Sequence, residues 1–175
     1  MSTQKDQALF SNLEKSVMSN LAMSGNCAQT AFIALMDEFQ MEGEQILKGL
    51  TAFPGIALRG ETCGAVSGCL MALGLEFGRG RENLDNWQAY INSLRPSRKF
   101  CHCFTNELGS TMCGEIVADK FGRQFDLADP VEAMEWLNCG AHKLCSEVIS
   151  NGVCIAATII LESRDQDQIL KSNTG

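Results

Sequence analysis

The helical spacing of apolar residues is the feature that most constrains the fold of this chain. Apolar positions recur at intervals of three and four residues through nearly the whole sequence, and runs of alternating β-branched and aromatic residues are absent. The pattern predicts an all-α fold, a single-domain bundle of about six to seven helices. We expect helices at the following ranges: 5–23, 26–40, 44–52, 62–77, 84–107, 111–121 and 129–162.

Glycine and proline mark the ends of these helices. Pro96 is expected to split or bend the fifth helix, because proline lacks a backbone N–H and clashes with the preceding turn. Gly140 and the pair Asn151 and Gly152 are candidates to interrupt the last helix. The organisation predicted from these signals is one helical cysteine-rich domain over residues 1–162 and a polar, frayed tail over residues 163–175.

Charge and hydropathy exclude several classes of partner. The chain has 14 basic and 21 acidic residues and a pI of about 4.8, so it lacks the clustered positive charge that nucleic-acid binding requires. We expect no nucleic-acid partner. The first 20 residues lack the apolar core of a signal peptide, and no apolar run approaches the roughly 18 residues of a membrane span. A cytoplasmic protein without a membrane partner is the expectation.

Nine cysteines are the most informative part of the composition. Disulfide bonds are rare in a reducing compartment, and an odd number of cysteines cannot all be paired, so we do not expect a disulfide framework. Metal binding and redox chemistry are therefore favoured. Free cysteine also behaves as a small buried hydrophobe, so we expect roughly half of the nine to serve packing alone.

Three cysteines are predicted to lie at helix N-termini. Cys27 follows Asn26, a good N-cap residue, while Cys63 follows Thr62 and Cys113 lies two residues after Thr111. First-turn N–H groups have no partner within the helix, and the helix dipole places partial positive charge there. Both effects favour thiolate over thiol, so converging helix starts would form a pocket for anionic sulfur.

Helical geometry separates other cysteines from this set. Cys69 lies about 240° around the helix from Cys63, so we expect it to face the core. The same spacing separates Cys139 from Cys145, and only one of these faces a shared centre if the helix is continuous. The segment FCHCF leaves the roles of Cys101, His102 and Cys103 open.

Known metal and catalytic motifs are absent from the sequence. It has no C-x-x-C and no C-x-x-C-H, so neither a zinc ribbon nor covalent haem attachment is expected. The two histidines, His102 and His142, lie in no nucleophile motif. Ligands for a metal would have to come from separate helices.

Small residues line one side of the predicted helix 62–77. Gly64 and Gly68 allow another backbone or a cofactor to approach closely. Tight helix–helix packing explains this face as well as a subunit interface does. We expect a homodimer.

Four segments resemble the family of redox-active proteins named for the pattern C_GCAxxG_C_C. They cover roughly residues 20–162 and read NCAQTAFIAL, GETCGAVSGCLMALGLEFG, FTNELGSTMCGEI and KLCSEVISNGVCIAATIILE. A related cysteine domain occurs in split-Soret cytochromes c, for which the resemblance implies a helical homodimer with an iron–sulfur centre beside haem. The resemblance implies Cys27, Cys63, Cys113 and Cys145 as the functional set, with Cys139 as a rival for the fourth position.

The leading hypothesis is a redox protein whose four thiolates hold an iron–sulfur cluster, of the two-iron type by analogy, and which exchanges electrons with an unidentified partner protein or senses redox state. One alternative is a metal-free dithiol protein with Cys63 as the attacking thiolate. Another is an interaction module with a structural zinc site. Visible absorption and elemental analysis separate the three.

Overall fold

The computed structural model describes residues 4–172, and within them the all-α prediction is confirmed, because no strand is present. Eight helices have six or more residues, and a four-residue turn, α4, forms a ninth helical segment. Two 3₁₀ turns, η1 (Leu50–Ala52) and η2 (Arg81–Asn83), connect longer elements. The helices are α1 (Gln4–Ser24), α2 (Cys27–Phe39), α3 (Glu44–Gly49), α4 (Gly55–Leu58), α5 (Gly64–Phe77), α6 (Trp87–Leu108), α7 (Cys113–Phe121), α8 (Pro130–Asn138) and α9 (Ala141–Ser172).

The predicted count of six to seven helices is too low, because the predicted helix 129–162 is in fact two helices. The chain breaks at Gly140, which has a φ of +84° and ends α8 in a conformation that glycine adopts without strain. Asp129 caps the start of α8, and its side chain accepts hydrogen bonds from the N–H groups of Val131 and Glu132. Pro96 does not split α6, which continues through it to Leu108. Asn151 and Gly152 do not interrupt α9, which continues through both of them.

Helix α9 continues beyond residue 162, where the polar tail was predicted to begin, as far as Ser172. Arg164 holds this part of the helix in place. Its guanidinium forms two hydrogen bonds, of 2.8 and 2.9 Å, with the carboxylate of Glu76 on α5, and it lies over the ring of Phe39 on α2. Residues 173–175 lie outside the described residues.

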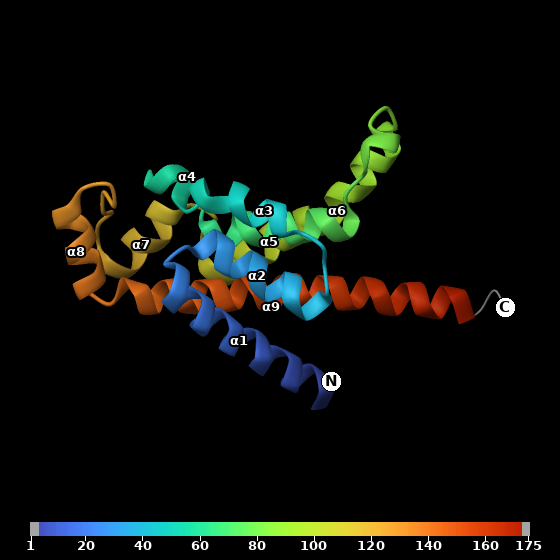
Figure 1. Ribbon diagram of the computed structural model, residues 1–175, viewed down its shortest axis with the longest axis horizontal. Coiled ribbons are helices and arrows are strands. Elements are labelled where there is room, and N and C mark those ends of the chain that lie inside the picture. Colours follow the sequence, from blue (N-terminus) through green and yellow to red (C-terminus); the bar gives the residue numbers. More distant parts are fainter. Residues whose placement is uncertain (1–3, 173–175) are drawn as a thin grey trace.

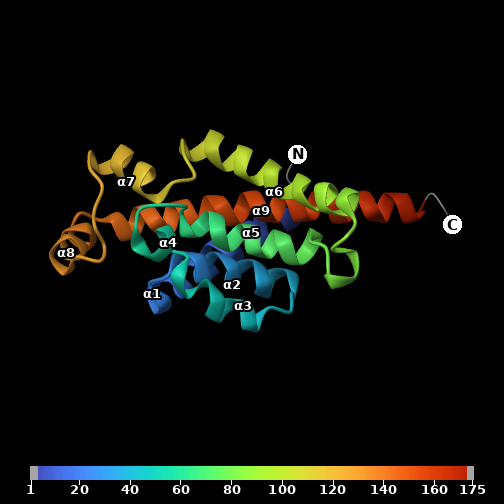
Figure 2. The ribbon, with the colours of Figure 1, turned by 90° about the horizontal axis from the view of Figure 1, so that it is seen from above.

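Helix α9 is the central element of the fold. Figure 1 shows it running along the length of the molecule, with α1 crossing it, and Figure 2 shows α5 and α6 lying along it. One cluster of buried apolar residues joins α1, α2, α5, α6 and α9. The segment Ala141–Gln166 is long and apolar enough to span a membrane, but Ile149, Val153 and Ile160 are completely buried in this core.

The small-residue face of α5 packs against α2 of the same chain. A methyl group at Gly68 would overlap the carbonyl oxygen of Ala28 and would lie 2.9 Å from the Cβ of Ala31. The expectation of tight helix–helix packing is therefore confirmed. Since α2 covers this face, it is no free surface for a second subunit, and the homodimer stays a prediction that rests on the family resemblance.

Candidate functional site

The starts of α5 and α7 are held side by side by a short antiparallel contact. Thr62 and Met112 form an isolated β-bridge, the N–H of Cys63 donates to Thr111 O at 2.8 Å, and the N–H of Cys113 donates to Glu61 O at 2.7 Å. Two cysteines therefore enter neighbouring helices from paired backbone. The N-cap positions are taken by Cys63 and Met112, and not by the threonines that precede them.

The start of α2 meets the start of α5. Asn26 caps α2 as predicted, and its side chain accepts hydrogen bonds from the N–H groups of Ala28 at 3.1 Å and Gln29 at 3.0 Å. The adjacent Cys27 sulfur lies directly against Gly64, where a methyl group would overlap it. The three helix starts predicted from the sequence therefore come together in the fold.

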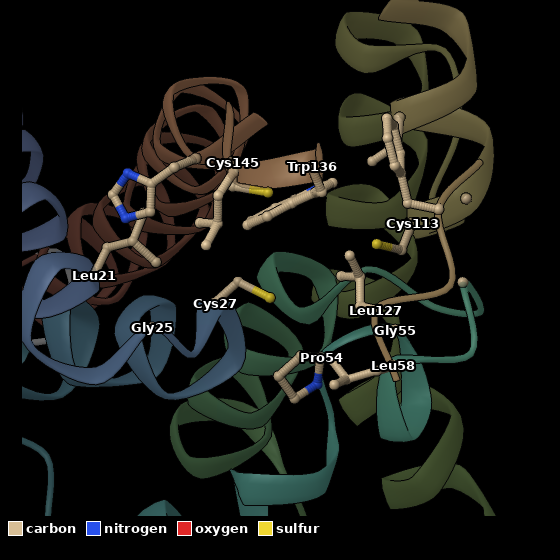
Figure 3. Close-up of a pocket in the computed structure, with 16 residues that line it drawn as sticks. Leu21, Gly25, Cys27, Pro54, Gly55, Leu58, Cys113, Leu127, Trp136 and Cys145 are labelled. Carbon is tan, nitrogen blue, oxygen red and sulfur yellow. The ribbon is translucent and has the colours of Figure 1, made fainter. Parts of the chain in front are cut away.

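A cavity of about 170 Å³ lies where these helix starts meet, and three thiols line it. Figure 3 shows the sulfurs of Cys27, Cys113 and Cys145 around this cavity. The remaining walls are mainly apolar and include Leu21, Pro54, Leu58, Phe125, Leu127 and Trp136. The cavity is larger than a single ion needs and is similar in size to cavities that bind benzene.

Cys145, and not its rival Cys139, lines the cavity. The break at Gly140 allows α9 to start in a new direction, and Cys145 lies in its second turn. Cys139 is exposed at the end of α8, where its S–H donates to Trp136 O at 3.2 Å. The geometry therefore places Cys145 with the thiols of Cys27 and Cys113.

Cys63 is next to the cavity, although it does not line it. Its side chain is 7% exposed. Burial raises its pKa, and negative charge on Cys27 or Cys113 raises it further. Among the described residues, no three His, Cys, Asp or Glu side chains converge closely enough to hold one metal ion. Three thiols therefore line a cavity with Cys63 beside it, and the four do not meet at a point.

The cysteines outside this set serve other parts of the fold. Cys69 is completely buried in the core, and its sulfur lies near Gly152 of α9, as the helical geometry predicts. Cys101 and Cys103 lie on α6, where Cys101 packs against the core. His102 is exposed and shares a hydrogen bond of 3.1 Å with the side chain of Asn106. None of these four residues lines the cavity.

Burial reverses the predicted effect of the helix starts on the thiols. Desolvation and repulsion between the thiolates raise the pKa of Cys27 and of Cys145 from 9.0 to about 12. The same causes raise the pKa of Cys63 still further, and burial raises that of Cys113. The N–H groups of Ala65 and Val66 do lower the pKa of Cys63, but by less than burial raises it. All four are neutral thiols near pH 7 when no positive charge is bound.

These raised pKa values predict that the metal-free protein loses stability in alkaline solution. Below about pH 9, Cys27 and Cys145 are protonated in both the folded and the unfolded chain. Between 9.0 and about 12 only the unfolded chain ionises them, so the free energy of unfolding falls as the pH rises. The loss approaches about 1.4 kcal/mol per pH unit for each thiol.

Urea denaturation of the reduced, metal-free protein at about pH 8 and about pH 10.5 measures this loss. The double variant Cys27→Ser/Cys145→Ser is the control, because serine does not ionise in this range. An equally steep loss in the double variant would show that other groups cause the alkaline instability.

Two features of the cavity wall were missed in the sequence. Trp136 and His142 both line the cavity, and the only sequence signal for His142 is its spacing of three residues from Cys145 on one helix.

The turn α4 forms another wall of the cavity, and its residues Ile56, Ala57 and Leu58 all have positive φ, between 47° and 63°. A left-handed turn costs about 1–2 kcal/mol for each such residue, and strain of this kind clusters at functional sites.

Comparison with protein families matches residues 25–159 to the family described as "Putative redox-active protein (C_GCAxxG_C_C)". The chain belongs to this family. The match contains all four thiols around the cavity, and it confirms the resemblance identified in the sequence. Neither the curated proteins nor the solved structures include a match to the chain. Membership of the C_GCAxxG_C_C family supports a redox role and names no cofactor.

Proposed function

We propose that Cys27, Cys63, Cys113 and Cys145 bind an iron–sulfur cluster, of the two-iron type by analogy, and that the protein acts in electron transfer or redox sensing. The observation that carries this proposal is that three thiols from three helices line one cavity and that a fourth thiol, Cys63, lies next to it. When bound, such a cluster supplies a one-electron couple whose potential depends on burial and on hydrogen bonds to sulfur.

The charge state of the thiols around the cavity suits an iron–sulfur cluster. These four thiols, of which Cys63 is buried and the others are partly buried, become thiolates near pH 7 only if bound positive charge offsets their desolvation and their mutual repulsion. Iron supplies that charge, and binding then releases the thiol protons. The N–H groups of Ala65 and Val66 act on the Cys63 sulfur, and that of Gly64 acts on the Cys27 sulfur, so polar donors already face the ligand atoms.

The two alternatives fit this arrangement less well. A structural zinc ion needs four ligands about 2.0–2.3 Å from one point, whereas these thiols surround a larger space. A dithiol protein needs a reactive thiolate, whereas burial raises the pKa of Cys63 and leaves its side chain 7% exposed. Both alternatives remain possible outcomes of the experiment below.

The decisive experiment is anaerobic reconstitution with iron and sulfide, followed by iron, sulfide and zinc analysis and visible absorption. We expect stoichiometric iron and acid-labile sulfide and a visible chromophore. Zinc in a colourless protein would support the structural zinc site. A metal-free protein that exchanges two thiols for a disulfide would support the dithiol alternative.

Variants of Cys145 and Cys139 form a matched pair that tests which of the two cysteines is the fourth ligand. Cys145→Ser removes a thiol from the cavity wall, so we expect iron uptake to fall by about tenfold or more. Cys139→Ser changes an exposed thiol on the neighbouring helix and should leave iron content and absorption unchanged. Equal losses in the two variants, or a larger loss from Cys139→Ser, would contradict the assignment.

A further inference from the structure

The indole of Trp136 is a polar group of the cavity wall that has no partner. Its Nε1 atom is buried and has no hydrogen-bond acceptor among the described residues, and Trp136 lines the same cavity as Cys27, Cys113 and Cys145. Figure 3 shows Trp136 at this wall together with the three sulfurs. A buried donor without an acceptor costs about 1–3 kcal/mol, so native structures rarely retain one without a reason.

Helix α8 is held in place by contacts that leave the indole N–H unused. Asp129 caps its first turn, and Glu135 forms an ion pair of 2.6 Å with Arg123. The backbone oxygen of Trp136 accepts the S–H of Cys139. The indole N–H therefore has no part in these contacts, although they fix the helix that carries it.

A group that fills the cavity can supply the acceptor for this N–H. The cavity lining is mainly apolar and includes Phe125, Leu127 and Leu137. Its side-chain acceptors are a ring nitrogen of His142 and the three sulfurs, and among the described residues none of them accepts from Nε1. The cavity also contains three thiols, so a group bound by them brings its own sulfur atoms close to the same walls.

We infer that Trp136 donates its Nε1–H to a sulfur of the cluster held by the four thiols, and this inference rests on the function proposed above. Trp136 is then a positioning residue that sets the potential of the site. A hydrogen bond to sulfur stabilises the more negative, reduced state, so it raises the reduction potential. Loss of the bond lowers the potential without removing a ligand.

The first test compares Trp136→Phe with Trp87→Phe after anaerobic reconstitution. Phenylalanine keeps an apolar ring in the wall, and it removes the N–H together with one of the two fused rings. Trp87 lies on α6 with 69% of its surface exposed, so its replacement is a control for the loss of one tryptophan. We expect Trp136→Phe to bind wild-type amounts of iron and sulfide at a more negative midpoint potential, and Trp87→Phe to match the wild type in both.

A second variant changes the strength of the donor and preserves the ring. The chain has two tryptophans, so a Trp87→Phe protein grown with 7-azatryptophan carries the analogue at position 136 alone. The N–H of the azaindole is the stronger donor, and the potential should shift in the positive direction. A residue that served only packing would not give opposite shifts in the two variants.

The possible results separate this inference from the proposed function. A wild-type protein that binds no iron and sulfide overturns both. A wild-type protein that binds them, with unchanged potentials in both Trp136 variants, overturns the inference and leaves the cluster in place. If Trp136→Phe fails to fold or to bind iron, the azatryptophan protein decides, and an unchanged potential there overturns the inference.

Discussion

We expect serine at position 63 to prevent binding of the proposed cluster and serine at position 69 to leave it intact. Cys63 lies at the start of α5, where the N–H groups of Ala65 and Val66 act on its sulfur and where it interacts with Cys27 and Cys113. Cys69 lies on the same helix but faces the core near Gly152. Loss of a thiolate ligand should lower iron uptake by about tenfold or more, while Cys69→Ser should cost only about 1–3 kcal/mol of stability for its buried hydroxyl.

Iron content and visible absorption of the two reconstituted variants measure this difference. Urea denaturation of the same samples shows whether each variant is folded. Both substitutions exchange sulfur for oxygen in α5, so the pair controls for the chemical change itself. A larger loss of iron from Cys69→Ser than from Cys63→Ser would show that the roles are reversed.

Alanine at Gly68 should destabilise the protein by about 3 kcal/mol, the upper end of the usual cost of overpacking. The new methyl group would overlap the carbonyl oxygen of Ala28 and would lie 2.9 Å from the Cβ of Ala31, so α2 and α5 would have to move apart. These two helices form the most extensive helix–helix contact in the described structure. Backbone atoms cannot rotate away as a flexible side chain can.

Gly74 provides the matched control in the same helix. A methyl group there would have no atom within 4 Å, so Gly74→Ala should stabilise the protein by about 0.5–1 kcal/mol through helix propensity. The urea midpoints of the two variants should therefore shift in opposite directions. A midpoint for Gly68→Ala equal to that of the wild type would mean that α2 and α5 are less tightly packed than the structure shows.

The helix starts could be predicted because their signals are local. Asn26 caps α2 through its own side chain, and glycine and proline end the preceding elements, so the positions of Cys27, Cys63 and Cys113 follow from short stretches of sequence. The break at Gly140 was also visible as a signal. The direction that α9 takes after this break could not be predicted from the sequence, because it depends on packing against α1, α2, α5 and α6.

The protonation state of the thiols was predicted in the wrong direction for a related reason. The effect of a helix N-terminus on a sulfur can be deduced from a few neighbouring residues. The opposing effect of burial depends on every element that excludes water. Negative charge on Cys145 and Cys113, which are far from Cys27 in the sequence, raises the pKa of Cys27 further. Desolvation is the larger of the two, so the tertiary structure decides the pKa.

The sequence by itself determined the all-α class, the family and the cysteines that begin helices, since these depend on periodicity and on motifs within single segments. Only the tertiary structure decided that Cys145 lines the cavity and Cys139 does not, and that α2 covers the glycine face of α5. It also decided that the indole N–H of Trp136 has no acceptor within the described part of the chain. Each of these depends on contacts between segments far apart in the chain, and such contacts leave no periodic signal in any one of them.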